Sequence, residues 1–310
     1  MARFILKRFL QLIPILMGVA TVTFLIMYVI PGDPVLSLVG ERYDAETLDR
    51  LREQIGLNEP LPIRYLNYLM DTFRLDLGRS FITGKPVIDS IREYFPRTLL
   101  LAASAMFLAV AAGLVIGVIS ALERFRWLGR FLMISSLVGV SIPVFWLGLL
   151  LIYLFSIKLS LLPPSGYGGG SLRYLILPAV TLSFASMATV ARVSRSAFLD
   201  ISSEDFARTA RAKGLNEFKV YGKHLFRNAL IPVITIVGTD FGSYLSGSVL
   251  TESIFGWPGL GRFIVRAILR RDFPVIQGSV LFMAVLFIMV NLAVDISYGI
   301  VDPRIRLRKG

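Results

Sequence analysis

The side chains that usually perform chemistry are scarce in this chain. It contains one histidine, His224, and no cysteine, so it offers neither a thiolate nucleophile nor a cluster of imidazole and thiolate ligands for a metal ion. Asp240 and Asp295 lie in apolar stretches far apart in the sequence, without a second ligand or base near either. The phosphate-binding pattern G-x-x-x-x-G-K-[ST] is absent. We therefore expect no catalytic residue, metal or cofactor in this chain, and we read His224 as a loop residue.

The composition indicates a membrane protein. Of the 310 residues, 55% are hydrophobic and 17% are charged, and the mean hydropathy of +0.69 is too high for a soluble fold of this size. The net charge of +12 raises the question of a nucleic-acid partner. However, the basic residues gather at the ends of apolar runs, where anionic lipid and membrane topology account for them. We expect the lipid bilayer, and no nucleic acid, as a partner.

Six apolar runs predict six transmembrane helices. A hydrocarbon core of about 30 Å requires about 20 helical residues, and backbone groups in lipid must bond within their own segment. The runs are 9–32, 98–122, 131–157, 174–191, 228–251 and 273–294. With the N-terminus inside, the cytoplasmic loops and tails hold eighteen Lys and Arg and the two short external loops hold six. The sequence thus predicts an all-α integral membrane protein whose N and C termini are both cytoplasmic, with the first run as an uncleaved anchor.

The external segments differ in character. Residues 33–97 alternate polar and apolar positions, with an amphipathic pattern over Ala45–Ile55 and a turn at Leu75–Ser80. This stretch predicts a small folded element on the outer face, and a loosely ordered loop is the alternative. The glycine-rich stretch Pro163–Gly170 is typical of a flexible connector.

The cytoplasmic loop 199–229 contains a short helix with defined ends. Ser202 or Ser203 can cap it, and Gly214 can take the left-handed conformation that stops it. Acidic residues open the helix and basic residues close it, as the helix dipole favours; these are Glu204, Asp205, Arg208, Arg211 and Lys213. A second helical stretch, Asn216–Asn228, returns to the membrane.

One side of this short helix carries small residues. Phe206, Ala207 and Ala210 leave little bulk beyond the phenyl ring, which permits close approach by another backbone. A docking helix for a cytosolic partner is one hypothesis. A basic amphipathic hairpin lying on the inner leaflet is the other.

The fifth run carries a polar face. At 100° per residue, one side collects Asp240, Ser243, Tyr244, Gly247 and Thr251. A charge in mid-membrane is costly, so Asp240 is expected to face a translocation cavity or to bond within the bundle. The opposite side carries a small-residue stripe of Gly238, Gly242 and Ser246.

Other runs carry features that we interpret as structural. Gly113 and Gly117 predict close helix packing, and Pro143 predicts a kink. Near the end of the last run, four polar residues share one face, which is also interpreted as structural: Asn291, Asp295, Tyr298 and Asp302.

Several stretches resemble the permease subunits of bacterial ABC importers, in the branch for dipeptides, oligopeptides, glutathione and nickel. The cytoplasmic loop is similar to that branch at Arg208–Gly214, followed by Arg227–Pro232. Three further stretches resemble it: Ile30–Pro34, Gly256–Gly261 preceded by Glu252 and Phe255, and Arg271–Gln277.

The resemblance implies the fold and the partners. It implies a type I importer permease bundle, in which a homologous second permease subunit, two cytosolic ABC ATPases and an extracytoplasmic solute-binding protein act with this chain. The ATPases would bind ATP and Mg, and hydrolysis would belong to them. Their docking would involve Asp205, Phe206, Arg208, Thr209, Ala210, Lys213 and Gly214.

The resemblance also implies a division of the chain and a cargo. Residues 1–32 would form the first transmembrane helix, 33–96 an extracytoplasmic segment, 97–302 a type-1 ABC transmembrane domain and 303–310 a cytoplasmic tail. The expected function is import of di- and oligopeptides or glutathione across the bacterial cytoplasmic membrane. Nickel or a metal chelate, or a secondary carrier without ATPases, are the alternatives.

Overall fold

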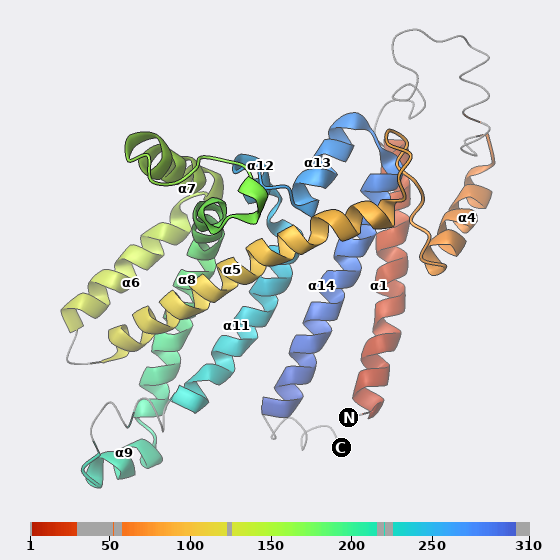
Figure 1. The fold of residues 1–310 in the computed structure, drawn as a ribbon. Coiled ribbons are helices and arrows are strands. Elements are labelled where there is room, and N and C mark those ends of the chain that lie inside the picture. The colour runs from red at the N-terminus through yellow and green to blue at the C-terminus, as the bar shows by residue number, and fades with distance from the viewer. Residues whose placement is uncertain are drawn as a thin grey trace. The chain divides into compact units, whose positions relative to one another are not determined.

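The computed structural model describes residues 2–29, 52, 58–122, 126–215, 220 and 226–301. Regular structure in these residues is helical, apart from one antiparallel bridge between Arg79 and Pro86. The α-helices are α1 (Ala2–Val29), α4 (Leu61–Phe73), α5 (Val87–Ala121), α6 (Arg126–Ser141), α7 (Val144–Leu151), α8 (Leu172–Ser202), α9 (Asp205–Ala212), α11 (Phe226–Gly247), α12 (Val249–Ile254), α13 (Leu260–Arg270) and α14 (Phe273–Val301). Figure 1 shows their order. A π-helical stretch, η2 (Ile152–Lys158), follows α7, and a short 3₁₀ turn, η3 (Gly168–Gly170), precedes α8.

In the described residues, the six apolar runs lie mainly on helices. Among these residues, three helices are long and apolar enough to cross a membrane, namely those at Val87–Ala121, Leu172–Ser202 and Phe273–Val294. Shorter apolar helices lie at Ile13–Ile26 and Val144–Lys158, and α11 carries the fifth run. The prediction of an all-α membrane protein is confirmed.

Two runs are not the single straight helices that their length predicted. The third run is divided between α6 and α7 because Pro143 lacks the backbone donor that a continuous helix needs and instead starts α7. The fifth run is divided at Ser248 into α11 and α12. The rotation of 100° per residue therefore does not carry the polar face of α11 onward to Thr251.

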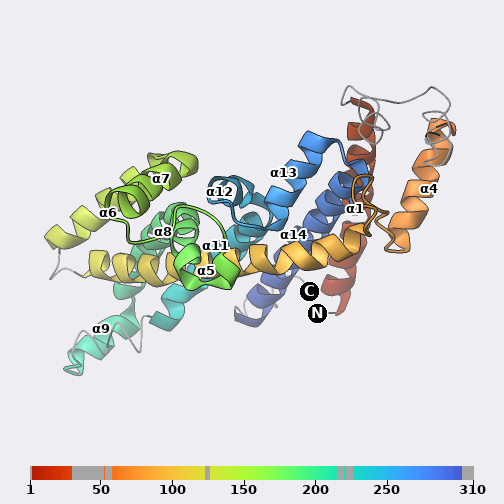
Figure 2. The ribbon, with the colours of Figure 1, turned by 45° about the horizontal axis from the view of Figure 1, so that its top comes forward.

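The chain forms two compact units that do not follow its linear order. The first unit consists of Met1–Thr98 and Pro258–Ile288. Its apolar core joins the start of α5 to α13 and α14 through residues such as Val87, Ile91, Leu260 and Phe273. Figure 2 shows that the chain reverses direction between α13 and the start of α14 within this unit. Leu75 and Gly78 have positive φ angles of 62° and 75°, which confirms the predicted turn at Leu75–Ser80.

The second unit consists of Leu99–Trp257 and Met289–Gly310, with α8 at its centre. α8 packs against α6, α7 and α11. The expected small-residue packing is present in α5, because a Cβ built on Gly117 would lie 2.5 Å from the Ser194 Cβ of α8. Gly238 approaches Val294 in the same way. The stretch Pro163–Gly170 is also attached, since Gly166 N donates to the carbonyl oxygen of Phe255 over 2.7 Å.

Some predictions lie outside the described residues. They include the helix at Ala45–Ile55 apart from Arg52, most of the stretch Asn216–Asn228, His224, Asp302 and the tail 303–310.

Candidate functional site

The short loop helix exists, and its end has the predicted conformation. α9 runs over Asp205–Ala212, and Gly214 has a φ angle of 75°, in the left-handed region that favours glycine. The described hydrogen bonds of the two predicted cap serines belong to α8. The hydroxyl groups of Ser202 and Ser203 donate to carbonyl oxygens of α8, whose last turn they complete. The first turn of α9 instead starts from Glu204, whose carbonyl oxygen accepts from Ala207 N at 3.0 Å.

One side of α9 packs on its own chain. Ala207 is fully buried and belongs to an apolar cluster with Phe198, Val220 and Ala229. The expectation that Ala207 offers docking surface is therefore wrong, because its methyl group fills the contact between α9 and the helices beside it. This packing gives α9 a rigid attachment to α8 and α11, since the cluster contains residues of both helices.

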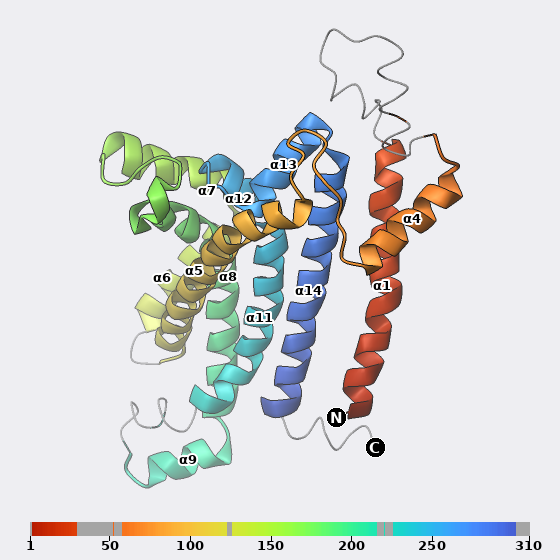
Figure 3. The same ribbon diagram turned by 45° about the vertical axis from the view of Figure 1, so that its right-hand side comes forward.

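The other side of α9 is exposed. Phe206 retains 40% of its accessible surface, which is high for a phenyl ring in a folded chain. Five further predicted docking residues are exposed, namely Asp205, Arg208, Thr209, Lys213 and Gly214; the side chain of Ala210 is not described. Figure 3 shows α9 beyond the ends of α8 and α11 in the second unit. An aromatic ring bordered by charges, on a helix with fixed packing, is suited to insertion into a groove on another protein.

The predicted polar face of α11 separates into two groups. Asp240 is partly exposed and Ser243 is exposed, whereas Tyr244 and Thr251 are buried within the chain. No residue in the described part of the chain forms an ion pair or hydrogen bond with the Asp240 side chain. The structure thus leaves the carboxylate available to water, a solute or a second subunit. Tyr244 instead packs inward, with its hydroxyl group beside Ser186 of α8.

Two further hydroxyl residues on the accessible side of α11 were not predicted from the sequence. Thr235 and Thr239 precede Ser243 by eight and four residues, so the three hydroxyl groups form a row along one face. Thr239 Oγ1 donates to the carbonyl oxygen of Ile236 over 3.0 Å, and Ser243 Oγ donates to that of Thr239 over 3.1 Å. The spacing of four between hydroxyl residues was the available signal. The predicted polar face was centred on Asp240, and Thr235 and Thr239 were therefore not included in it.

The first unit contains a pocket of about 590 Å³ between the start of α5 and α13. Stacked rings of Tyr94 and Phe263, with centroids 4.5 Å apart, form part of its wall. Lys85, Arg266 and Arg270 also line it, and all three side chains are exposed. None of the three forms an ion pair with a carboxylate in the described residues. Two carboxylates also line this α5–α13 pocket, but Glu93 contacts Arg97 and Asp272 is buried and hydrogen-bonded within the chain. The three exposed cations are therefore the charges that can receive an anionic partner.

Asp272 holds the edge of this pocket in place. Its buried carboxylate accepts from Ser80 Oγ over 2.5 Å and from Phe81 N over 3.0 Å, although these residues lie about 190 positions earlier. Arg271 takes a left-handed φ angle of 56°, which ends α13 and turns the chain toward Asp272. From the sequence, Arg271–Gln277 was only a stretch that resembles the permease family, and no structural role was predicted for it. The structure assigns Asp272 the joining of two distant segments.

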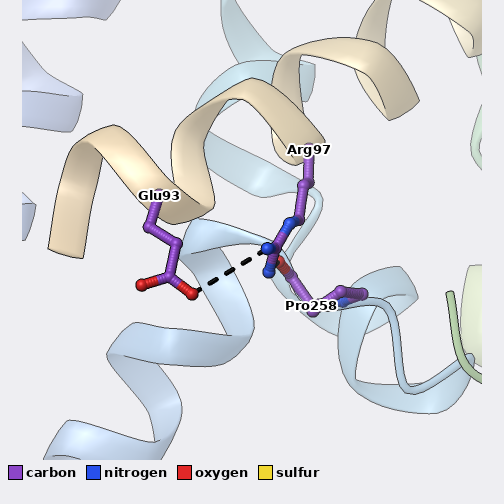
Figure 4. Close-up of polar contacts among 3 residues, drawn as sticks. All are labelled: Glu93, Arg97 and Pro258. Carbon is purple, nitrogen blue, oxygen red and sulfur yellow. Dashed lines mark hydrogen bonds and ion pairs between the residues drawn. The ribbon is translucent and has the colours of Figure 1, made fainter. Parts of the chain in front are cut away.

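The turn before α13 is held from α5. Figure 4 shows Arg97 between Glu93 and Pro258, with Arg97 Nη2 at 3.8 Å from Glu93 Oε1 and Nη1 donating to the Pro258 carbonyl oxygen over 3.5 Å. The adjacent Thr98 Oγ1 accepts from Leu260 N over 2.8 Å, which satisfies an otherwise orphan donor at the start of α13. Together these contacts fix the stretch Gly256–Gly261 that the sequence singled out.

Comparison with known families gives two matches that together cover nearly the whole chain. Residues 113–307 match the family described as binding-protein-dependent transport system inner membrane component. Residues 1–102 match the N-terminal region of such membrane components.

Named relatives align over their full length. The chain is 43% identical over 312 residues to a putative peptide transport system permease protein of Brucella abortus (strain 2308), covering 99% of each. It is 42% identical over 308 residues to the glutathione transport system permease protein GsiC of Escherichia coli (strain K12), covering 99% of this chain and 100% of that protein. Among solved structures, the inward-facing MetNI methionine ABC transporter matches with a TM-score of 0.60 and 18% identity, over 69% of this chain and 97% of the other. This last likeness concerns the fold.

Proposed function

The chain belongs to the family of binding-protein-dependent transport system inner membrane components, and from this premise we propose that it is one permease subunit of an ATP-driven importer for di- and oligopeptides or glutathione. It is a multi-pass membrane protein, and we place it in the bacterial cytoplasmic membrane. The observation that carries the proposal is α9, a short helix that packs on its own chain on one side and is exposed on the other. Relatives named as peptide and glutathione permeases support the solute class.

The proposed partners are a homologous second permease subunit, two cytosolic ABC ATPases and an extracytoplasmic binding protein. ATP and Mg would be bound by the ATPases. Closure of the ATPase dimer would move the α9 helices, and the rigid contact through Ala207 would transmit that movement to α8 and α11. The spans would then alternate between openings toward the two sides of the membrane. We retain the division into 1–32, 33–96, 97–302 and 303–310 as part of this proposal.

The translocation path is proposed to include the accessible side of α11. Asp240 and Ser243 are its first members from the predicted set, and Thr235 and Thr239 extend the row. Tyr244 and Thr251 would support this face from within the chain, since both are buried. A hydroxyl row with one carboxylate offers hydrogen bonds and a site for an ammonium group, which suits peptides as solutes.

The α5–α13 pocket is proposed to contact the binding protein. In the topology predicted from the Lys and Arg of the short loops and tails, its two segments, 33–97 and the loop between the last two spans, would lie on the external side. Its unpaired cations favour an acidic edge of the partner. Nickel or a metal chelate as cargo of the same machinery, and a secondary carrier, remain the alternative functions to be tested.

The test is reconstitution of the complete complex in vesicles, with uptake of a dipeptide and of glutathione measured beside ATP hydrolysis. Binding-protein-dependent uptake of either solute that requires ATP supports the proposal. Uptake of nickel alone, or uptake without any ATPase, contradicts it.

The coupling role of α9 is tested in the same vesicles with Gly214→Val. A Cβ on Gly214 would meet nothing within 4 Å, so the substitution acts through its positive φ angle alone. Gly169→Val is the matched control, because Gly169 has a φ angle of 65° and equal space but lies in the connector before α8. We expect Gly214→Val to reduce copurification of the ATPases and Gly169→Val to preserve it. Equal copurification in both variants would contradict the docking role.

A further inference from the structure

α4 is attached to α1 by a row of tyrosine contacts. The hydroxyl groups of Tyr65 and Thr21 lie 2.6 Å apart, and those of Tyr68 and Thr23 lie 3.1 Å apart. Each threonine hydroxyl also donates to a carbonyl oxygen of α1, so the tyrosines act as donors to the threonines. The Phe24 ring packs against both tyrosine rings, at centroid distances of 5.2 and 5.6 Å. These contacts define one face of α4.

The contacts set the depth of α4 relative to the membrane. The apolar part of α1 from Phe9 to Val29 spans about 30 Å at 1.5 Å per residue, which is the thickness of the hydrocarbon core. Thr23 lies about 9 Å along the axis from Val29. The tyrosine hydroxyl groups therefore reach below the end of that apolar stretch. Burial raises the pKa of Tyr68 above its ordinary value, which agrees with a site shielded from water.

A second face of α4 is apolar and is not covered by the residues that the structure describes. Ile63, Leu66, Met70 and Phe73 recur every three or four residues and retain 47%, 57%, 49% and 72% of their accessible surface. This apolar stripe, as we name these four residues, lies beside the α1 contact face on the helical wheel. α1 also has exposed apolar side chains, among them Val22, Leu25 and Ile26.

A third face is polar and exposed. Asn67, Asp71 and Arg74 recur at the same helical spacing on the remaining side. α4 thus has three faces: one with tyrosines that contact α1, one with exposed apolar side chains and one with exposed polar side chains. A helix beside α1 at the membrane boundary has these three neighbours: the protein laterally, acyl chains on one side and water on the other.

We propose that α4 is an interfacial helix whose apolar stripe inserts among the acyl chains of the lipid leaflet next to the end of α1 at Val29. The polar face of Asn67 and Asp71 then meets the headgroups and water. Lipid is the favoured occupant because the stripe is apolar and exposed, and because the contacts of Tyr65 and Tyr68 with α1 hold α4 at the depth of the hydrocarbon. This assignment goes beyond the proposed function, since it depends on α1 crossing the membrane and is independent of the solute. It replaces the sequence-based expectation that this part of segment 33–97 rests on the outer face.

The absence of cysteine makes a direct test possible. Single cysteines at Leu66 and Met70 on the stripe, and at Asn67 and Asp71 on the polar face, are labelled with a nitroxide in the assembled complex in vesicles. Collision of the label with oxygen, which concentrates in acyl chains, is compared with collision with a water-soluble nickel chelate. Melting temperature and ATP hydrolysis of each labelled complex are compared with those of the unlabelled parent.

We expect labels at Leu66 and Met70 to collide at least several-fold more with oxygen than with the chelate, and labels at Asn67 and Asp71 to show the reverse ratio. High chelate collision at both stripe positions would place the stripe in water and overturn the proposal. Low collision with both reagents at the stripe positions would mean that a protein subunit covers it, which also overturns the proposal. A failure of peptide uptake leaves these ratios unaffected, so the two proposals fail separately.

Discussion

Asp240 lies within an apolar span and Asp272 directly precedes one, and the surroundings of the two carboxylates differ. Asp272 is buried and accepts two hydrogen bonds from the Ser80–Phe81 segment. Asp240 is partly exposed and has no hydrogen-bond or ion-pair partner in the described residues. A carboxylate that is bonded within the chain stabilises the fold, whereas one left accessible in a span is available for function. We therefore expect substitution of Asp272 to lower stability and substitution of Asp240 to change transport.

Removing the Asp272 carboxylate is expected to destabilise the protein. Asp272→Ala leaves Ser80 Oγ and Phe81 N without their acceptor in a buried place, at a cost of about 1–3 kcal/mol for each buried group left unsatisfied. The melting temperature of the purified complex should fall. Asp89→Ala is the control, because its contact with Arg92 at 3.6 Å is exposed and contributes little. Equal melting temperatures for both variants would contradict the role assigned to Asp272.

Neutralising Asp240 is expected to alter transport while stability is retained. Asp240→Asn keeps the shape of the side chain and replaces acceptor-only oxygens with a mixed amide. If the carboxylate faces the path, uptake of a peptide with a free amino terminus should fall and the melting temperature should stay constant. A buried charge pair would give the opposite result, since stranding the partner charge typically costs about 3–5 kcal/mol. Lowered stability with normal uptake per molecule would therefore exclude the path assignment.

At the scale of elements, α9 shows what a sequence can and cannot predict. The helix, its acidic start and its stop at Gly214 follow from local rules, and the structure confirms them. Ala207 was placed on the wrong side because a small residue at helical spacing suits both a docking face and a tight internal contact. Only the positions of Phe198 and Ala229, which belong to other helices, decide between them.

The breaks in the third and fifth runs also depend on residues from other parts of the chain, which a local sequence pattern does not reveal. Pro143 indicated a kink, but whether a proline bends or divides a helix depends on the surrounding packing. The break at Ser248 has no proline, and Ser248 Oγ bonds to the buried Glu252 at 3.0 Å. The joining of Ser80 to Asp272 could not be derived either, because no local pattern links residues so far apart in the chain.

The neighbouring residues Phe206 and Ala207 are expected to respond differently to substitution. Phe206→Ala removes an exposed ring, so the melting temperature should be retained while ATPase copurification and coupled hydrolysis decrease. Ala207→Leu adds bulk to a closed contact and should cost about 1–3 kcal/mol of stability. The melting temperature and ATPase copurification of both variants are measured in detergent and coupled ATP hydrolysis in vesicles, each beside the parent. If Phe206→Ala behaves as the parent in both assays, the exposed face of α9 is not the docking face.

At the scale of the whole molecule, the fold places chemistry of different kinds in its two units. The first unit holds the cationic pocket and the interfacial helix, and the second holds α9 and the accessible hydroxyl row of α11. α5 and α14 each contribute residues to both units. In the proposed importer, these two helices and the connection at Trp257–Pro258 would be the parts of the chain that carry a signal between the units.

This arrangement predicts a long-range effect from the pocket. Arg266→Glu combined with Arg270→Glu reverses two unpaired, exposed cations, so an acidic edge of the binding protein should be repelled. Stimulation of ATP hydrolysis by the binding protein should fall several-fold, most strongly at low ionic strength where charges are least screened. Basal hydrolysis should persist, because α9 is unchanged. Arg92→Glu is the control, since it reverses an exposed charge in the same unit that does not line the pocket. Normal stimulation of the double variant at low salt, or an equal loss in the control, would contradict docking at this pocket and leave the coupling role of α9 standing.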